Sequence, residues 1–447
     1  MNFYVVPFNP SIYLLMSIQY PSISLLSNRK KNDMAKLRPF RAVRPTRDKA
    51  HLVASRPIFT YKPSILKAKL QENPFTFIHI IHPEYFEDES NKTEPNSLER
   101  FQKVKKKYEE FVERGTFDQD DIPSFYIYRQ TKNDHAFLGV IAGASVEEYQ
   151  NNKIKKHEAT ITSREEMFTN YLDIVGVNAE PVLLSHEKSL EVDEILSSIT
   201  SMRAEYDFST TDNVHHELWI ASEEEVKSLQ QAYDKIENVY IADGHHRSAS
   251  SVRLAERRLE QNPSATGKNY EAFLSFFIDE ERLQILPFHR LCKSLNGLTK
   301  VQLLEKLELR FDISTISKGS TPKNMHEFQM YIENEWFKLV AKPDVISKSD
   351  AVSSIDAEIL TREVLSPILG IHDLKTDKNV GFLSGETKIK KIEQLVNKEV
   401  YKVAFLLHPA TMEQVKNVAD ENAVMPPKST WVEPKLRSGL TIYKIDE

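Results

Sequence analysis

Residues 240–256 read YIADGHHRSASSVRLAE and join a short apolar strand to a helix through a polar turn. The strand, Val239–Ala242, shows no polar alternation, which is typical of a strand buried on both faces. The helix is predicted by apolar residues at helical spacing, namely Ala249, Val252, Ala255 and Leu259. A glycine and a capping residue are enough for such a turn, but this one also carries two histidines and an arginine. These extra residues predict a binding function for the turn.

The turn has the residue types of a phosphate cradle. Gly244 can adopt a positive φ and lets a ligand approach the backbone closely. The helix behind it presents unpaired N–H groups and the positive end of its dipole, and Arg247 offers a planar fork that matches phosphate oxygens. We therefore expect a phosphate group to bind at Asp243, Gly244, His245, His246, Arg247 and Ser248.

A purely structural role for the turn is the alternative. Asp243 would then only cap the helix, and the histidines would be solvated. Capping accounts for Asp243 and Gly244 but leaves the basic residues unexplained. A zinc site is disfavoured, because adjacent histidine side chains diverge.

The turn belongs to a predicted strand–helix–strand–helix unit. Leu218–Ala221 is expected to be a strand, and Ser222–Glu225 has the spacing of a capping box that starts a helix. The strand Val239–Ala242 follows, and the two strands would be parallel if they share one sheet. The turn after the second strand is where such folds bind anionic ligands. His215 and His216 are expected on the strand that neighbours this turn, and Trp219 is expected in the core.

A second candidate site is KHEAT, Lys156–Thr160. Glu158 could serve as a general base or as a magnesium ligand. The alternative is a solvated helix start that carries surface charges, within a block, residues 147–172, that is expected to be mostly helical. Spacing alone does not decide between the two.

The third candidate is PPKST, Pro426–Thr430. Its KST resembles the end of a Walker loop, but the glycines that cradle phosphates are absent, so a Walker motif is excluded. Lys428 is expected to contact a phosphate, with a rigid surface turn as the alternative.

Further elements follow from local patterns. Phe75–Ile81 and Tyr401–His408 are predicted strands, and Ser124–Gln130 and Ala136–Val146 are predicted to pair. Helices are predicted over Ser97–Arg114 and from Thr411, where Gln414 completes a capping motif.

Composition sets the broad class of the protein. The chain has 447 residues, 40% of them hydrophobic, and a formal charge of −6, which argues against non-specific nucleic-acid binding over the whole surface. Cys292 is the one cysteine, so no intrachain disulfide can form, and we expect a cytoplasmic protein. Residues 1–33 are apolar but interrupted by Pro7, Pro10 and Pro21, which argues against a membrane helix. We expect a disordered or mispredicted extension, with a weak organelle-targeting sequence as the alternative.

Together these segments resemble the bacterial domain-of-unknown-function 1015 family. The landmarks follow the family order through nearly all of the chain from Met34 onward, and they are RPFRAVRP (38–45), KHEAT (156–160), EPVLL (180–184), HELW (216–219), YIADGHHRSAS (240–250) and MPPKSTWVEPKLRSGL (425–440). The resemblance implies a relation to the ParB/sulfiredoxin-like superfamily, which includes nucleotide-dependent free serine kinases. It also implies that the loop Asp243–Arg247 binds nucleotide phosphates.

We therefore predict a mixed α/β fold, with a ParB/sulfiredoxin-like nucleotide-binding core over residues 34–290. A smaller C-terminal α+β part, residues 291–447, would carry the MPPKST turn. The expected function is that of a nucleotide-dependent small-molecule kinase that uses ATP or ADP and phosphorylates a hydroxyl acceptor such as free serine. The alternative is a ParB-like, nucleotide-gated binding protein that is non-catalytic or only hydrolyses nucleotide.

The expected roles in the kinase follow from residue chemistry. Asp243 would hold Mg²⁺ or orient His246, and Glu158 would be the base. The backbone of residues 244–248, with Arg247 and Lys428, would bind phosphates. Charge neutralisation of a loose phosphoryl transition state explains why basic groups and a metal would converge there.

Overall fold

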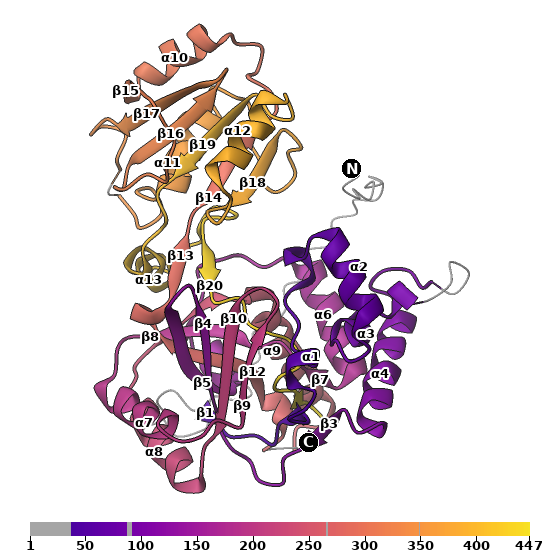
Figure 1. Ribbon diagram of the computed structural model, residues 1–447. Coiled ribbons are helices and arrows are strands. Elements are labelled where there is room, and N and C mark those ends of the chain that lie inside the picture. Colours follow the sequence, from indigo (N-terminus) through magenta and orange to yellow (C-terminus); the bar gives the residue numbers. More distant parts are fainter. Residues whose placement is uncertain (1–36, 87–91, 265–266, 348) are drawn as a thin grey trace. The chain divides into compact units, whose positions relative to one another are not determined.

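The computed structural model describes residues 37–86, 92–264, 267–347 and 349–447, and Met34–Glu447 form one compact unit. The predicted extension, residues 1–33, lies outside the described residues. The fold is a mixture of helices and of two large sheets (Figure 1), which confirms the predicted mixed α/β class. The predicted boundary between residues 290 and 291 stays a prediction.

A nine-stranded sheet forms the centre of the N-terminal part of the fold. Its strands lie in the order β6 (Ile154–Lys155), β11 (Val239–Asp243), β8 (Val182–His186), β12 (Ala272–Asp279), β5 (His135–Ser145), β4 (Tyr126–Lys132), β10 (Val214–Ile220) and β9 (Tyr206–Thr210), and β1 (Leu37–Arg38) pairs with β5. The predicted pairing of Ser124–Gln130 with Ala136–Val146 is confirmed by β4 and β5.

Strands β10 and β11 share this sheet and run in the same direction, as predicted, because an even number of antiparallel steps separates them. They are not neighbours, since β8, β12, β5 and β4 lie between them. The expectation that His215 and His216 lie on a strand beside the turn is therefore wrong. Trp219 is buried in the core, as expected.

The order of three strands at one side of the sheet positions the candidate site. Strand β11 is parallel to β6, with Tyr240 opposite Lys155, and antiparallel to β8, with Asp243 opposite Leu183. The ends of β6 and β11 and the beginning of β8 therefore meet at one edge of the sheet. KHEAT, the turn after β11 and the segment before β8 are brought together there.

Three helices form layers beside this edge (Figure 1). Helix α9 (His245–Gln261) packs on β8 and β12, α6 (Thr162–Val175) packs on α9, and α4 (Leu98–Glu113) packs on α6. Helix α4 confirms the helix predicted over Ser97–Arg114, and the Ser97 side chain caps it. The strand predicted over Phe75–Ile81 is wrong: Ile78–Ile81 is the short helix α3, which packs on α4. A short apolar run does not by itself distinguish the two.

The other elements of this part are shorter. The helices are α1 (Ala50–Val53), α2 (Pro63–Glu72), α5 (Val146–Gln150), α7 (Leu190–Thr200) and α8 (Glu223–Tyr233). The predicted capping box at Ser222–Glu225 is confirmed at the start of α8. Two-stranded pairs are formed by β2 (Val43–Pro45) with β3 (Phe117–Gln119), and by β7 (Val177–Asn178) with β21 (Tyr443–Lys444).

A six-stranded sheet with its own apolar core occupies the C-terminal part of the sequence. Its order is β15 (Phe311–Ile316), β17 (Glu335–Ala341), β16 (Glu327–Ile332), β19 (Val403–Leu407), β14 (Phe288–Cys292) and β18 (Val380–Ser384), and its helices are α10 (Lys300–Glu308), α11 (Asp356–Leu360), α12 (Ile389–Asn397) and α13 (Met412–Asp420). Strand β19 and the capping box at Thr411 confirm the elements predicted there.

The last residues return to the first core. Strand β20 (Trp431–Glu433) pairs with β13 (Gln284–Leu286). Beyond it, Leu436, Leu440 and Tyr443 are buried in the same cluster as the nine-stranded sheet. The segment after the MPPKST turn thereby reaches the edge that carries the DGHHR turn.

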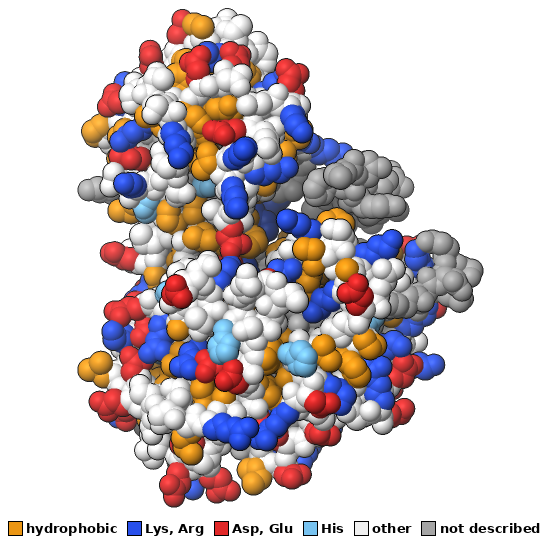
Figure 2. All heavy atoms as spheres, viewed as in Figure 1, with side chains coloured by type: hydrophobic (Ala, Val, Ile, Leu, Met, Phe, Trp, Pro, Cys, Tyr) orange, Lys and Arg blue, Asp and Glu red, His pale blue; other side chains and the backbone are white. Residues whose placement is uncertain are grey.

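The surface in Figure 2 has Lys and Arg side chains interspersed with Asp and Glu side chains on the face shown. Within the described residues, no helix combines the length and the apolar composition that crossing a membrane requires.

Arg290 anchors the MPPKST turn from β14. Its side chain is fully buried and donates to the carbonyl oxygens of Phe288 at 2.8 Å, Lys428 at 3.0 Å and Pro427 at 3.3 Å. No carboxylate among the described residues forms an ion pair with it, and burial lowers the pKa of its guanidinium to about 9. One buried guanidinium group thus donates hydrogen bonds to three carbonyl oxygens.

We expect Arg290→Ala to destabilise the protein by about 3 kcal/mol or more, because it leaves buried carbonyls without donors and opens a cavity. The measurement is urea unfolding, with Arg310→Ala as the control, since the Arg310 side chain is 51% exposed. Equal stabilities of the two variants would contradict the anchoring role of Arg290.

Candidate functional site

The DGHHR turn is built around a glycine in the left-handed region. Gly244 has φ +103° and is the N-cap residue of α9. A Cβ atom at this position would lie 2.9 Å from Nη2 and 3.0 Å from Nε of Arg247. Gly244 is therefore required both by its backbone conformation and by the guanidinium of Arg247, which folds back over the turn.

Asp243 does not cap the helix. Its Oδ1 accepts a hydrogen bond from Nζ of Lys435 at 3.0 Å, and its Oδ2 accepts one from Nη2 of Arg247 at 2.9 Å. Among the described residues, no side chain forms a hydrogen bond that caps helix α9. The capping alternative for Asp243 is therefore wrong, and the residue instead holds two cations at the turn.

The helix start keeps three backbone donors without acceptors. The first hydrogen bond of α9 runs from the Ser248 N–H to the Gly244 carbonyl at 3.0 Å. Within the part of the chain that the structure describes, the backbone N–H groups of His245, His246 and Arg247 have no acceptor. Three bare amides at the positive end of a 17-residue helix form an anion-binding arrangement.

Ser248 contributes less than its neighbours. Its N–H is used inside the helix, and its Oγ donates to the His245 carbonyl at 3.0 Å. The residue is fully buried. Its predicted part in phosphate binding stays a prediction, and both of its donors have acceptors within α9.

Glu180 completes the ion-pair network. It precedes β8 and forms a close ion pair with Nη1 of Arg247. Two cations, Arg247 and Lys435, thus face two carboxylates, Asp243 and Glu180. Burial alone would raise the pKa of Asp243, but Lys435 and Arg247 hold it well below its usual value. The site is charge-balanced, and Nε of Arg247 has no hydrogen-bond partner among the residues that the structure describes.

Sequence reasoning assigned no individual role to Glu180 or to Lys435. Both residues lie in segments that it had identified, EPVLL and the stretch after PPKST. The sequence feature that could have identified Glu180 as a site residue is its position as an acidic residue just before a buried strand. Its distance from the turn depends on the strand order, in which β8 lies beside β11.

Two histidines at the site are buried and neutral. His157 and His245 are 1% and 5% exposed, and their rings are perpendicular with centroids 4.5 Å apart. Burial lowers the pKa of each to about 3. His246 is half-buried; burial also lowers its pKa, and its buried Nδ1 has no partner. A neutral His246 can accept a proton.

Glu158 lies at the same edge as the turn. Its Oε2 is 3.5 Å from Nδ1 of His245, and its side chain is 41% exposed. KHEAT is not helical: it follows β6, and α6 begins only at Thr162. The expectation of a mostly helical block over residues 147–172 is wrong in this segment, because residues 154 and 155 pair with β11.

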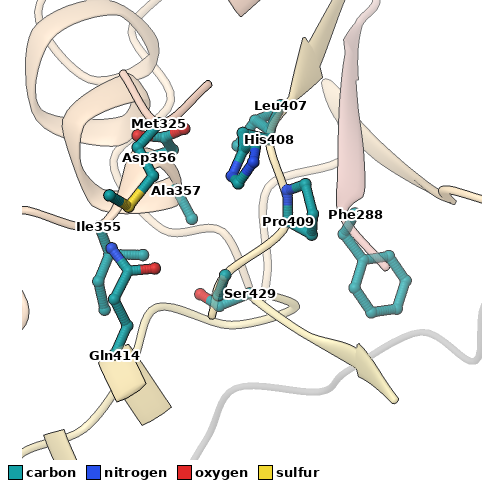
Figure 3. Close-up of a pocket in the computed structure, with 11 residues that line it drawn as sticks. Phe288, Met325, Ile355, Asp356, Ala357, Leu407, His408, Pro409, Gln414 and Ser429 are labelled. Atoms are coloured by element: carbon teal, nitrogen blue, oxygen red, sulfur yellow. The ribbon is translucent and has the colours of Figure 1, made fainter. Parts of the chain in front are cut away.

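The MPPKST turn contacts KHEAT through its backbone. The Met425 N–H donates to the His157 carbonyl at 2.9 Å. Lys428 is exposed, and its ammonium group lies 5.4 Å from the centre of the Phe288 ring. Beside it, Ser429 and Phe288 line a cavity together with His408 and Asp356 (Figure 3). The volume of this cavity is about 10 Å³, which suits one water molecule rather than a phosphate. A phosphate contact by Lys428 stays a prediction.

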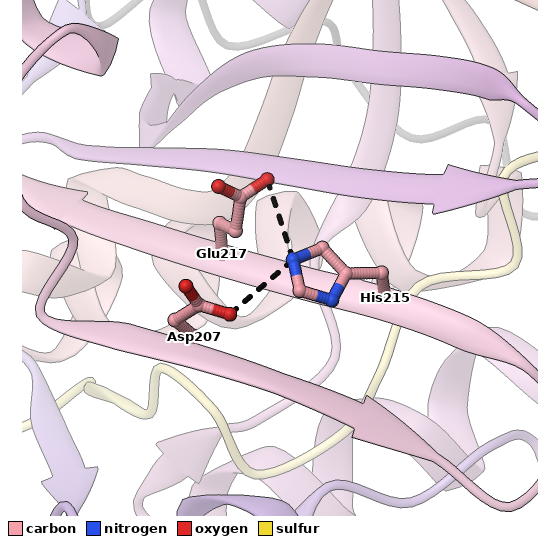
Figure 4. Close-up of side chains that lie close together, drawn as sticks. All are labelled: Asp207, His215 and Glu217. Atoms are coloured by element: carbon pink, nitrogen blue, oxygen red, sulfur yellow. Dashed lines mark ion pairs between the residues drawn. The ribbon is translucent and has the colours of Figure 1, made fainter.

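A group of possible metal ligands lies elsewhere, on β9 and β10. Nε2 of His215 is 3.3 Å from Oδ1 of Asp207 and 3.7 Å from Oε2 of Glu217 (Figure 4). Glu217 also accepts two hydrogen bonds from the Arg129 guanidinium, at 2.5 and 2.6 Å. The Arg129 fork neutralises this carboxylate, so the cluster is explained by ion pairs.

The buried histidines predict acid sensitivity. An unfolded histidine titrates near pH 6.5, whereas His245 and His157 titrate near pH 3 in the fold. Their contribution to stability is complete above about pH 6.5 and decreases below it, because the unfolded state then binds more protons. Each histidine should add up to about 1.4 kcal/mol per pH unit to the decrease in unfolding free energy.

The measurement is urea unfolding at several pH values between 7.5 and 5 for the parent and His245→Asn. We expect a shallower dependence on pH for the variant. Identical slopes would show that His245 can be protonated within the fold.

Three comparisons relate the chain to known proteins. Solved structures similar to it include a free serine kinase in complex with AMP, with 12% identity and a TM-score of 0.33 over 68% of this chain and 91% of that one. They also include SbnI with a C-terminal truncation from Staphylococcus aureus, with 12% identity and a TM-score of 0.35 over 67% and 85% of the chains. A conserved hypothetical protein from Pyrococcus furiosus has 14% identity and a TM-score of 0.32 over 68% and 94%. None of the curated proteins matches the sequence.

Similarity at this level leaves the activity to be argued from the residues of the site. The family model described as "Protein of unknown function (DUF1015)" matches residues 37–358, which is more than half of the chain and includes KHEAT and the DGHHR turn. The chain therefore belongs to the DUF1015 family.

Proposed function

We propose that the protein is a nucleotide-dependent small-molecule kinase that transfers a phosphoryl group from ATP or ADP to a hydroxyl acceptor such as free serine. The observation that carries the proposal is the bare N-terminus of α9. Its three free amides lie beside two basic side chains, Arg247 and Lys435, and no side chain among the described residues caps the helix. A phosphate group satisfies these amides, and the helix dipole favours its negative charge.

Phosphoryl transfer requires positioning and charge neutralisation more than covalent chemistry. A phosphate at the start of α9 would meet the backbone of His245 and His246 together with the unpaired Nε of Arg247. In the reaction, the acceptor oxygen forms a bond to the terminal phosphorus while the bond from that phosphorus to the bridging oxygen breaks. The shortened nucleotide leaves with the electron pair of the broken bond, and the hydroxyl proton passes to a base.

Three groups at the site can take that proton. Glu158 is half exposed beside His245, and Glu180 uses only one of its oxygens for the ion pair with Arg247. His246 is a neutral ring at the helix start. We retain Glu158 as the base, because its carboxylate forms no ion pair with Lys or Arg among the described residues.

Asp243 does not fit the role of a magnesium ligand in this arrangement. Each of its two oxygens already accepts a hydrogen bond from a cation, one from Arg247 and one from Lys435. A metal ion there would face two positive side chains. We therefore assign no step to Mg²⁺ and give Asp243 the role of positioning Arg247 and Lys435.

A nucleotide-gated binding protein, as in ParB relatives, is the second candidate. The same bare helix start supports it, since binding phosphates does not require an acceptor. The two functions differ in what happens to an added hydroxyl compound. The experiment is ³¹P NMR of the protein with ATP or ADP in the presence and absence of a hydroxyl acceptor, with serine and simple primary alcohols tested separately.

A kinase produces a phosphate ester and the shortened nucleotide only when the acceptor is present. A gated binding protein binds nucleotide, or hydrolyses it, without a phosphorylated acceptor. If neither ATP nor ADP binds at all in calorimetry, both functions are excluded.

The contribution of Arg247 is tested by substitution. Arg247→Ala removes a charge-assisted contact, and we expect nucleotide affinity to fall about 10- to 100-fold. Arg247→Lys should recover only part of it, because a point charge does not reproduce the fork. Arg257→Ala is the matched control, since Arg257 lies on the same helix about 15 Å further along and its side chain is 34% exposed, against 25% for Arg247.

Calorimetry gives the affinities, and melting temperatures identify variants that are merely unfolded. If Arg247→Ala binds every nucleotide as tightly as the parent does, Arg247 does not contribute to nucleotide binding.

A further inference from the structure

A cavity of 280 Å³ opens beside the Arg247–Glu180 ion pair, and none of the sequence motifs accounts for it. Its volume is close to the lower end of the roughly 300–1,000 Å³ that small-molecule sites span. It lies among α4, α6 and the start of α9. Apolar and aromatic side chains supply most of its wall, including Phe77, Ile81, Phe101, Met167, Phe168 and Leu172.

The polar part of the wall includes the residues of the proposed phosphate site. Arg247 and Glu180 both line the cavity. Arg247 occupies one oxygen of Glu180, and the other oxygen accepts no hydrogen bond from the described residues. A molecule in the cavity can therefore place a hydroxyl group against a free carboxylate oxygen, next to the helix start where the phosphate would bind.

Arg100 is the second arginine of the wall, and its charge is balanced by Glu84, which does not line the cavity. Arg100 donates to the Ile81 carbonyl at 2.9 Å and to both oxygens of Glu84 at 3.2 Å. It also contacts His82, whose Nδ1 lies 2.9 Å from Glu84. All of these contacts of Arg100 are made by its Nη2, and they leave its charge paired with Glu84, whereas one oxygen of Glu180 accepts no hydrogen bond from the described residues.

The apolar wall selects against a small zwitterion. Both arginines of the wall are already paired with carboxylates, Arg247 with Glu180 and Arg100 with Glu84. The carboxylate of serine would therefore find no unpaired Lys or Arg among the residues that line the cavity, and burying an unpaired charge is strongly unfavourable. A hydrocarbon chain or ring instead gains from each methylene that it removes from water.

We infer that this cavity binds the acceptor of the reaction, and that the acceptor is a primary alcohol with an apolar body rather than a small polar hydroxy acid. Its hydroxyl donates to Glu180, which for this acceptor takes the proton in place of Glu158, and its chain fills the space between α4 and α6. The role of the hydroxyl rests on the proposed kinase function, whereas binding in the cavity does not.

The probes are the primary alcohols from propan-1-ol to octan-1-ol, with serine as the polar comparison. Calorimetry without nucleotide should show affinity rising about fourfold with each added methylene, and no binding of serine. In the presence of ATP, octan-1-ol should yield octyl phosphate and ADP.

Two variants place the binding site in the cavity. Ala179→Phe fills it and should weaken octan-1-ol at least tenfold. Phe168→Ala removes a ring from the wall of the cavity, and this ring is 37% exposed. This variant replaces Ala179→Phe in the test if Ala179→Phe does not fold. The control is Phe59→Ala, which removes the same ring from a position that is 69% exposed and outside the cavity, and which should bind octan-1-ol as the parent does.

The outcomes separate this inference from the proposed function. If alcohols bind more tightly as their chains lengthen, and Ala179→Phe or Phe168→Ala abolishes this binding, the cavity is the binding site. If the alcohols bind in this way but are not phosphorylated, only the kinase function is excluded. Affinity that does not change with chain length overturns the inference. Phosphorylation of serine, with octan-1-ol neither bound nor phosphorylated, also overturns it and leaves the kinase standing.

Discussion

The ion pairs of Asp243 with Arg247 and Lys435 are the interaction on which the candidate site depends. They draw the Asp243 side chain away from the capping position and leave the first amides of α9 free. Gly244 makes this possible, because it permits a positive φ and leaves space for the Arg247 guanidinium. A side chain that capped the helix would accept hydrogen bonds from its free amides, but it would also block the anion site. The fold thus keeps an unsatisfied helix start at the edge of its largest sheet, which is the expected pattern where local stability is given up for function.

The strand order brings distant parts of the sequence to this point. Strand β6 supplies KHEAT, β11 supplies the turn, β8 is preceded by Glu180, and the return of the chain after β20 supplies Lys435. Arg290 holds the MPPKST turn by two of its carbonyls, those of Pro427 and Lys428, and the Met425 N–H ties that turn to the His157 carbonyl. The site is therefore assembled from four segments, and each is fixed by backbone pairing or by buried hydrogen bonds. Such support is needed for a site that holds charged groups at fixed distances.

Local sequence patterns predicted the β11–α9 turn and most of the helices and strands around it. They succeeded where capping residues and apolar spacing agree, as at Ser222 and Thr411. They failed at Phe75–Ile81, where a short apolar run is compatible with a helix or a strand. They placed His215 beside the turn, although four strands separate β10 from β11. Glu180 and Lys435 were not assigned roles for the same reason, because their distance from Asp243 is set by long-range pairing that no local pattern records.

The central claim is that the bare amides at the start of α9 bind phosphate. Backbone amide NMR spectra of protein labelled with ¹⁵N-histidine test it directly, since His245 and His246 are among only 14 histidines and supply two of the three free N–H groups. Titration with ADP should shift both amide signals in a saturable way, while the signal of His372, which lies on the C-terminal part of the chain, stays in place. If ADP saturates the protein and the amides of His245 and His246 do not move, the phosphate binds elsewhere and the account is contradicted.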